Sequence, residues 1–430
     1  MTLANLVSCL GILVLLAVAW LLSRDRRRVP WRVIGWGLGL QLAFALLLLR
    51  TPWGRAAFQG ARAAITRILA FTDAGSAFLW GNLYRTSPDV VAHLGPGAGG
   101  MRWWQATDAS SGQLATIGTV FVMHVLPTII FFSSLMAILY HLGIMQRVIG
   151  GMAWVMRRSM GTSGAESLSC AANIFVGQTE APLVIRPYVS ALTMSELMAV
   201  MIGGFATIAG GVMVAYVRFG IDPGHLMAAS VMSAPAALVI AKIMYPEAET
   251  SQTAGRVTLA IPREHANVID AAAGGAAVGL RLAANVAAML LAFIALIAML
   301  DWLLGLAGTS MTQLLGWLFA PIAWCLGVPW SEASAVGNLL GTKIAINEFV
   351  AYIQLADEMH RSALSPRSAV IATYAICGFA NFGSIAIQIG GIGSVAPDRR
   401  SDVARLGLRA MFGGALASWL TAAIAGILTG

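Results

Sequence analysis

Long apolar runs of about 20 residues recur along most of this 430-residue chain, beginning with residues 3–22. About 20 consecutive apolar residues allow one helix to cross the hydrocarbon core of a bilayer. The runs do not alternate with a period of two, which favours helices over a membrane β-barrel. Charged residues make up 11% of the chain, whereas a soluble domain has roughly 25%. The sequence therefore predicts an all-α integral membrane protein.

We expect about eight membrane spans, at residues 3–22, 32–50, 115–139, 195–217, 224–245, 281–305, 369–392 and 404–428. Two further apolar regions, 155–190 and 312–356, fit poorly as single spans because Gly, Pro and ionisable residues interrupt them. Backbone that is not helical is tolerated at membrane depth only where protein or a water-filled cavity satisfies it. We interpret these two regions as re-entrant hairpins that enter and leave on the same side.

Arginine-rich loops indicate the orientation. Residues 23–32, "SRDRRRVPWR", hold five arginines, and such loops face the cytoplasm. With two hairpins, the arginine-rich segment 397–409 is cytoplasmic as well, and both termini lie on the non-cytoplasmic side. The net charge of +8 thus comes from arginines that flank the membrane spans. The sequence has no basic domain that would indicate nucleic-acid binding. A cytoplasmic (inner) membrane location is expected.

The stretch 177–188, "GQTEAPLVIRPY", places ionisable and polar groups inside an apolar region. Gly177 and Pro182 interrupt the helix, and Gln178, Thr179 and Glu180 lie between them. A charged residue at membrane depth is costly, so Glu180 marks a candidate functional site. A structural alternative is that Glu180 only forms an ion pair with Arg186 or Lys343.

A second stretch, "GTKIAINEFVAY" (341–352), repeats the pattern with Glu348. A span interrupted by small and polar residues follows each hairpin, "GGFATIAGG" (203–211) after the first and "CGFANFGSIAIQIGG" (377–391) after the second. The two halves have opposite orientation, so the fold is predicted as an inverted repeat, which is typical of secondary transporters. The alternative for their Ser, Thr and Asn side chains is a hydrogen bond within their own helices. Glu166 is interpreted as interfacial.

The stretches "NIFVGQTEAPLVIRP", "GTKIAINEFVAY" and "CGFANFGSIAIQIGGIGSVAPDRR" resemble the concentrative nucleoside transporters, and the similarity extends from about residue 115 to the C-terminus. This resemblance implies cation-driven uptake of nucleosides, such as uridine, by a homotrimer. It also implies a scaffold around a mobile transport domain that moves as an elevator.

The resemblance also implies roles for individual residues. The residues expected to meet the nucleobase are Gln178, Thr179, Glu180 and Val212. Those expected at the ribose are Glu348, Asn381 and Ser384, with Phe379 packed beside the nucleoside. A sodium site is expected from side-chain or main-chain oxygens of Asn173, Val176, Thr207 and Ile208. Sodium is favoured as the coupling ion because the chain keeps the GQTEAP pattern, from which the proton-coupled branch departs.

Four sequence segments follow from this interpretation. They are 1–114 (N-terminal helices and an external or interfacial segment, scaffold), 115–194 (third helix, interfacial helix, first hairpin), 195–305 (discontinuous helix, following and connecting helices) and 306–430 (second hairpin, discontinuous helix, C-terminal helix). Proton-coupled uptake of a nucleoside or another small hydroxylated solute remains an alternative. A membrane enzyme that uses the two glutamates as acid and base is a further alternative, but no nucleophile or metal motif supports it, and we expect no enzymatic activity.

Overall fold

The computed structural model describes residues 3–81, 84, 120–253 and 265–429. Within these ranges the regular secondary structure is helical, without a strand. By length and composition, seven helical segments could each cross a membrane. The predicted all-α membrane fold is confirmed. The later part of the external or interfacial segment expected within 1–114, residues 82–83 and 85–114, lies outside the described residues.

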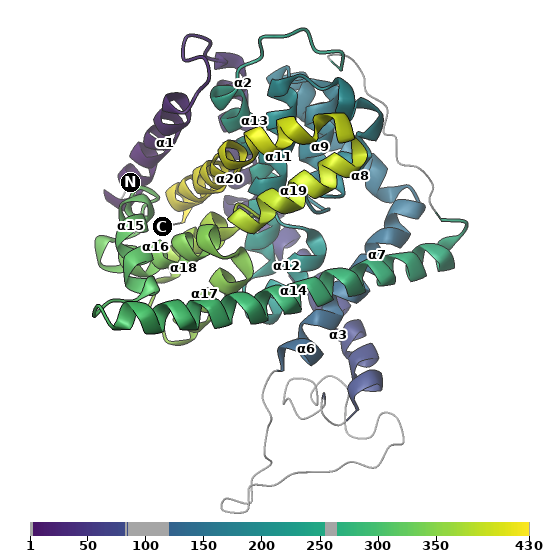
Figure 1. Cartoon of the computed structure of the whole chain (residues 1–430), viewed down its shortest axis with the longest axis vertical. Helices are drawn as coiled ribbons and strands as arrows, with labels where there is room; N and C mark the ends of the chain where they lie inside the picture. Colours follow the sequence, from purple (N-terminus) through teal and green to yellow (C-terminus); the bar gives the residue numbers. More distant parts are fainter. Residues whose placement is uncertain (1–2, 82–83, 85–119, 254–264, 430) are drawn as a thin grey trace, which may run out of the picture.

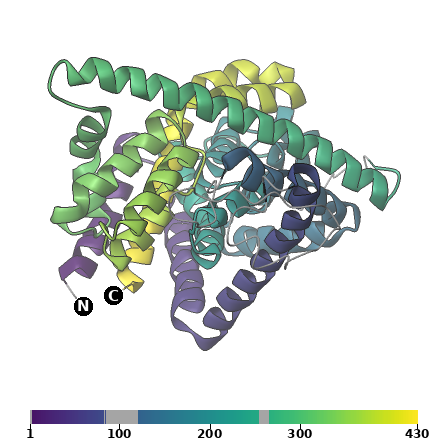
Figure 2. The ribbon, with the colours of Figure 1, turned by 90° about the horizontal axis from the view of Figure 1, so that it is seen from below.

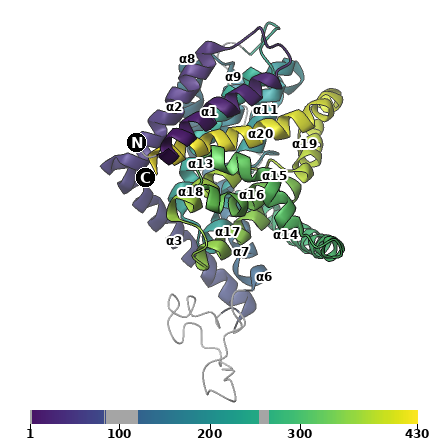
Figure 3. The ribbon, with the colours of Figure 1, turned by 90° about the vertical axis from the view of Figure 1, so that its left-hand side faces the viewer.

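One group of long helices packs around two buried helices, α13 (Pro223–Met244) and α20 (Arg400–Leu428). Its other members are α1 (Leu3–Leu21) and α2 (Trp31–Arg50). Helix α1 packs against α20, and α2 packs against α13. The two chain ends described by the structure lie close together (Figures 1 and 3). Helix α3 (Pro52–Trp80) follows α2 at a sharp turn and occupies part of the segment that was expected to be external or interfacial.

A second group contains α7 (Leu126–His141), preceded by the short α6 (Phe121–His124), and α14 (Val268–Gly305). Helix α14 runs along one face of the molecule and packs on α7 (Figures 1 and 2). The two backbones approach closely, since a Cβ added at Gly279 would lie 2.7 Å from the Cα of Ile130. Helix α14 has 38 residues, or roughly 57 Å at 1.5 Å per residue. The predicted span 281–305 was therefore too short, because the apolar pattern continues to the Asn267 cap.

Two spans are interrupted, as the sequence predicts. The first consists of α11 (Met194–Ala206) and α12 (Gly210–Arg218), and the second of α18 (Pro366–Ile376) and α19 (Phe382–Val395). The breaks fall at residues 207–209 and 377–381. Neither α18 nor α19 is long enough to cross a membrane alone, which explains why the described residues contain seven long candidates and not eight.

Each hairpin directly precedes one of these interrupted spans in the chain. The first consists of α9 (Gly164–Asn173), a turn, α10 (Ala181–Val184) and the 3-10 helix η1 (Arg186–Ala191), and the second of α16 (Trp330–Ala345) and α17 (Glu348–His360). The predicted regions were too wide. Residues 155–160 belong to the preceding α8 (Ile144–Met160), and most of 312–329 belongs to α15 (Met311–Cys325), which meets α16 at a bend of 115°. A short 3-10 helix, η2 (Pro397–Arg399), leads into α20.

Candidate functional site

The two interrupted spans meet at their breaks. Gly378 has φ +134°, a backbone conformation that favours glycine, and a Cβ there would lie 2.6 Å from the carbonyl oxygen of Phe205. The end of α18 therefore lies directly on the last turn of α11. No other residue type satisfies both the conformation and the close approach without strain. The polar side chains of both hairpin tips converge around this crossing.

Glu348 is the first residue of α17, next to the Asn347 cap, and is 4% exposed. Its Oε1 accepts a hydrogen bond from the hydroxyl of Tyr216 at 3.2 Å, and its Oε2 accepts one from Nδ2 of Asn381 at 3.1 Å. Three elements, α12, α17 and α19, thus fix one carboxylate. Lys343 donates instead to the carbonyl of Ala375 at 3.2 Å.

Asn381 also caps α19. Its Oδ1 accepts from the backbone N–H of Ser384 at 2.8 Å, so its amide is oriented with Nδ2 toward the carboxylate of Glu348. Phe379 is half-buried and precedes this cap, with its carbonyl accepting from the backbone N–H of Asn381 at 2.9 Å. Sequence reasoning missed Tyr216, although it lies one helical turn after the predicted residue Val212, which is buried on α12.

The first hairpin tip reaches the same region from α9. Gln178 accepts from Nε2 of Gln388 at 3.1 Å, and that amide also donates to the carbonyl of Met201 at 3.0 Å. A Cβ at Gly204 would lie 2.8 Å from Nε2 of Gln388, so the small residue is required for this contact. Sequence reasoning also missed Gln388, although it follows Ser384 by four residues and therefore lies on the same face of α19.

Thr179 and Glu180 complete the tip. A Cβ at Gly391 would lie 2.9 Å from Cγ2 of Thr179, so this residue packs closely on α19. Oε2 of Glu180 is buried without a hydrogen-bond partner in the described residues. In the same part of the chain, neither Arg186 nor Lys343 forms an ion pair with it. The purely structural explanation for this carboxylate is therefore not supported.

The predicted cation ligands lie between α9 and the break of the first interrupted span. Nδ2 of Asn173 donates to the carbonyl of Ser169 at 3.1 Å, which leaves its buried Oδ1 without a described donor. Thr207 is 1% exposed and donates to the carbonyl of Gly203 at 3.0 Å. A Cβ at Gly203 would lie 3.4 Å from Nδ2 of Asn173. Asn173 and Thr207 therefore both contact Gly203, Asn173 by packing and Thr207 by its hydrogen bond.

Main-chain oxygens add to this set. Residues 176 and 208 lie outside regular helices, and no described donor reaches the carbonyls of Val176 and Ile208. Neutral amide, hydroxyl and carbonyl oxygens suit a small alkali cation at an unwound helix. The described residues contain no group of three or more His, Cys, Asp or Glu placed to hold a metal ion. The donor chemistry therefore fits sodium.

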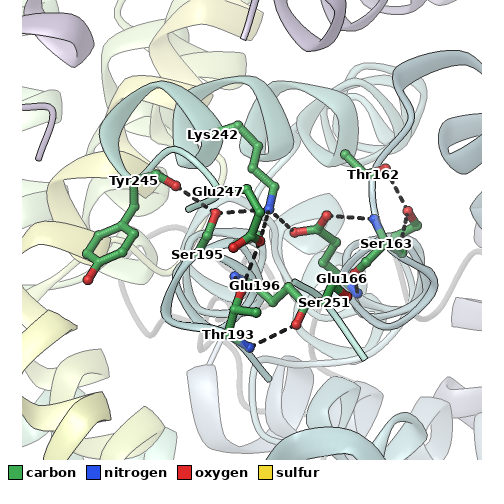
Figure 4. Close-up of polar contacts among 12 residues, drawn as sticks. Thr162, Ser163, Glu166, Thr193, Ser195, Glu196, Lys242, Tyr245, Glu247 and Ser251 are labelled. Carbon is green, nitrogen blue, oxygen red and sulfur yellow. Dashed lines mark hydrogen bonds and ion pairs between the residues drawn. The ribbon is translucent and has the colours of Figure 1, made fainter. Parts of the chain in front are cut away.

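A separate buried cluster joins the starts of α9 and α11 to the end of α13 (Figure 4). Nζ of Lys242 lies 2.8 Å from Oε2 of Glu166 and 3.3 Å from Oε2 of Glu247, and it donates to Ser195 at 2.9 Å. Glu166 is 1% exposed, so it is buried within the protein. It lies in the first turn of α9, where it also forms a capping box with Ser163, and its expected position at the membrane interface stays a prediction.

Two opposed hairpins whose tips meet two interrupted helices at polar, buried residues form the architecture of a secondary transporter. The comparisons with known proteins agree. Family models described as Na+ dependent nucleoside transporter N-terminus and C-terminus match residues 10–83 and 225–426. A model described as nucleoside recognition matches residues 122–222. The chain belongs to the Na+ dependent nucleoside transporter family.

Relatives cover nearly the whole chain. An uncharacterized transporter of Haemophilus influenzae is 42% identical over 98% of this chain and 97% of its own length. Sodium/nucleoside cotransporter 1 of Mus musculus is 41% identical over 99% of this chain. The chain spans 64% of the length of that mouse protein.

Solved structures show the same fold. CNTnw in an inward-facing substrate-bound state has a TM-score of 0.89 and 44% identity, with complete coverage of both chains. A substituted CNTnw in an outward-facing state has a TM-score of 0.88 and 43% identity, covering 100% of this chain and 98% of that one. This fold therefore matches that of a transporter solved in both an inward-facing and an outward-facing state. The two re-entrant hairpins correspond to those of the same transporter.

Proposed function

We propose that this chain takes up nucleosides across the cytoplasmic membrane by sodium-coupled symport. The observation that carries the proposal is the buried carboxylate of Glu348, which Tyr216 and Asn381 hold at the meeting point of the hairpins and breaks. A carboxylate with four lone-pair positions can accept from Tyr216, from Asn381 and from two vicinal ribose hydroxyls. An uncharged solute with paired hydroxyls therefore fits this group.

The first hairpin supplies groups that suit a nucleobase. Gln178 and Thr179 offer both donors and acceptors, as a base edge requires, and Glu180 has a buried oxygen that can accept from a base N–H. Val212 and Phe379 provide apolar surface beside the base and sugar. In this proposal Ser384, on the same face of α19 as Asn381, completes the ribose side.

Sodium would link the first hairpin to the interrupted span. In this assignment the ion binds Asn173, Val176, Thr207 and Ile208, so it holds the turn after α9 against the break after α11. Gln178, which is proposed to bind the nucleoside, lies in the same turn, two residues after Val176. Sodium binding therefore orders the hairpin tip for the nucleoside, and by linkage the nucleoside strengthens sodium binding by the same factor.

The wider organisation is part of the proposal. The hairpins and interrupted helices move together as an elevator within a homotrimer, and both termini lie on the non-cytoplasmic side. The four segments 1–114, 115–194, 195–305 and 306–430 retain the roles expected from the sequence. Light scattering in detergent tests the trimer, and cysteine labelling of intact cells at the C-terminus tests the orientation.

Uptake into proteoliposomes tests the function. We expect radiolabelled uridine to accumulate with an inward sodium gradient and not with an inward proton gradient at matched membrane potential. Purine nucleosides are tested in parallel. Asn173→Ala should raise the sodium concentration needed for half-maximal uptake, whereas Glu348→Gln should weaken nucleoside binding more than sodium binding. Absence of nucleoside uptake under both gradients would contradict the proposal.

Proton coupling is the second candidate, and the unpartnered Oε2 of Glu180 is the observation that favours it. A carboxylate oxygen without a fixed donor could take up and release a proton during each transport cycle. In that case uridine uptake would follow the proton gradient, and Glu180→Gln would abolish the coupling. Dependence on sodium alone rules this candidate out.

A further inference from the structure

A cavity of 630 Å³ lies where α1, α13 and α20 meet, away from the site described above. It is lined by Leu22 and Arg24 just after α1, by Met194 at the start of α11, by Met244 and Tyr245 at the end of α13, and by the first half of α20. Phe412, on α20, is 40% exposed and forms part of the wall. The cavity therefore combines an apolar wall with an opening at the surface.

The charge of this cavity has one sign. Arg24, Arg405 and Arg409 line it, and its lining contains no Asp or Glu. None of the three arginines forms an ion pair within the described ranges. The closest acidic residues in sequence are already paired, Asp25 with Arg28 at 3.3 Å and Asp402 with Arg399 at 3.0 Å.

Arg24 is held in place. Its guanidinium lies 4.9 Å from the ring centroid of Tyr245, a cation–π contact, and its backbone N–H donates to the carbonyl of Met244 at 2.9 Å. Arg405 and Arg409 are exposed and lie four residues apart, so they extend from the same face of α20. Guanidinium groups bind phosphate oxygens in bidentate geometry. The three together provide a site for a phosphodiester.

The position of the cavity indicates whether this phosphate belongs to a phospholipid or to a free anion. Arg24 follows the apolar span Ala4–Leu21 by three residues, and arginines at the ends of spans lie at the membrane interface. Leu408 and Phe412, also four residues apart on α20, are 51% and 40% exposed. Apolar side chains next to an arginine cluster match a phospholipid, whose acyl chains continue from its phosphate, better than a free anion.

We propose that this cavity binds an anionic phospholipid, with its phosphodiester among Arg24, Arg405 and Arg409 and an acyl chain along Leu408 and Phe412. Basic pockets between membrane helices are known to select anionic headgroups. Such a lipid bridges the end of α1, the end of α13 and the start of α20. Because α1 and α13 both pack against α20, the bound lipid stabilises this group of helices.

Native mass spectrometry and thermal unfolding test the proposal on the full-length protein after delipidation. Phosphatidylglycerol should bind and raise the Tm, whereas phosphatidylcholine should do neither. The double variant Arg405→Gln/Arg409→Gln should lose about 30-fold in phosphatidylglycerol affinity, from two near-surface charges. The matched control, Arg157→Gln/Arg158→Gln, removes the same charge from the last turn of α8 and should bind phosphatidylglycerol like the wild type.

Several outcomes would overturn this inference. If glycerol 3-phosphate or inorganic phosphate produced the same shift, the site would bind a free anion. If the control lost affinity equally, the binding would reflect general surface charge. If neither lipid bound while the oligomer persisted, a second copy of the chain would cover the cavity. Since both substituted arginines are exposed, the double variant should fold, and the single variants Arg405→Gln and Arg409→Gln provide a second measurement.

Discussion

Removing the hydroxyl of Tyr216 isolates one contact of the proposed ribose site. In Tyr216→Phe the ring remains, together with its stacking on Tyr352 at 4.2 Å and its edge contact with Phe349 at 4.9 Å. Only the hydrogen bond to Oε1 of Glu348 at 3.2 Å is lost. A hydrogen bond to a charged group contributes about 1.5–3 kcal/mol. Because this bond is long, we take about 1.5 kcal/mol for its orientation of the carboxylate toward the ribose, so the loss in nucleoside affinity should reach at most roughly tenfold.

The matched control is Tyr352→Phe. Its hydroxyl donates to the carbonyl of Thr373 at 2.9 Å, in the same aromatic cluster but away from the carboxylate of Glu348. Calorimetric titration with uridine, or with the nucleoside that the uptake assay identifies, measures the affinity of both variants. Thermal unfolding measures their stability. The reasoning is refuted if Tyr216→Phe binds nucleoside as tightly as the wild type, or if both variants lose affinity equally.

Three other substitutions test the surrounding structure. Gln388→Leu removes the donor to the side-chain Oε1 of Gln178, and we expect a roughly tenfold loss in nucleoside affinity, measured by the same titration. A small change in Tm without a change in affinity would contradict this role. Lys242→Met leaves Glu166 as a buried charge without its ion pair, which costs about 3–5 kcal/mol and should lower the Tm strongly. The double variant with Glu166→Gln should recover part of that loss, and no recovery would argue against the pair. Gly378→Ala places a methyl group against the backbone of α11 at a positive φ, which costs about 1–3 kcal/mol of strain, and we expect reduced expression and a lower Tm. A Tm equal to that of the wild type would show that the crossing is loose.

Much of the fold could be predicted from the sequence because the bilayer limits the choices. Runs of apolar residues must be helices in a membrane, and Gly, Pro or ionisable residues within such runs mark the interruptions. The breaks after Ala206 and Ile376 follow from this rule. The extent of the hairpins did not, since α8 and α15 also carry many apolar residues and end only a few residues before the hairpin helices α9 and α16 begin.

The sequence also determined which side chains are costly at membrane depth, and therefore where a site could form. Glu180 and Glu348 were identified in this way. Tyr216 and Gln388 were not, because a single Tyr or Gln on an apolar helix carries no comparable signal. Periodicity places such a residue on a face of its own helix, but it does not say which other helix that face meets.

Only the tertiary structure decided the partners. Tyr216 and Glu348 are 132 positions apart, and Gln178 and Gln388 are 210 positions apart. Their contacts depend on how closely the helices approach, which glycines such as Gly204 allow at particular points. Local sequence specifies the helices and their breaks through backbone hydrogen bonding and hydrophobicity. The pairing of polar groups is specified by packing between distant segments, because a buried donor or acceptor is satisfied only when the whole fold brings its partner within about 3 Å.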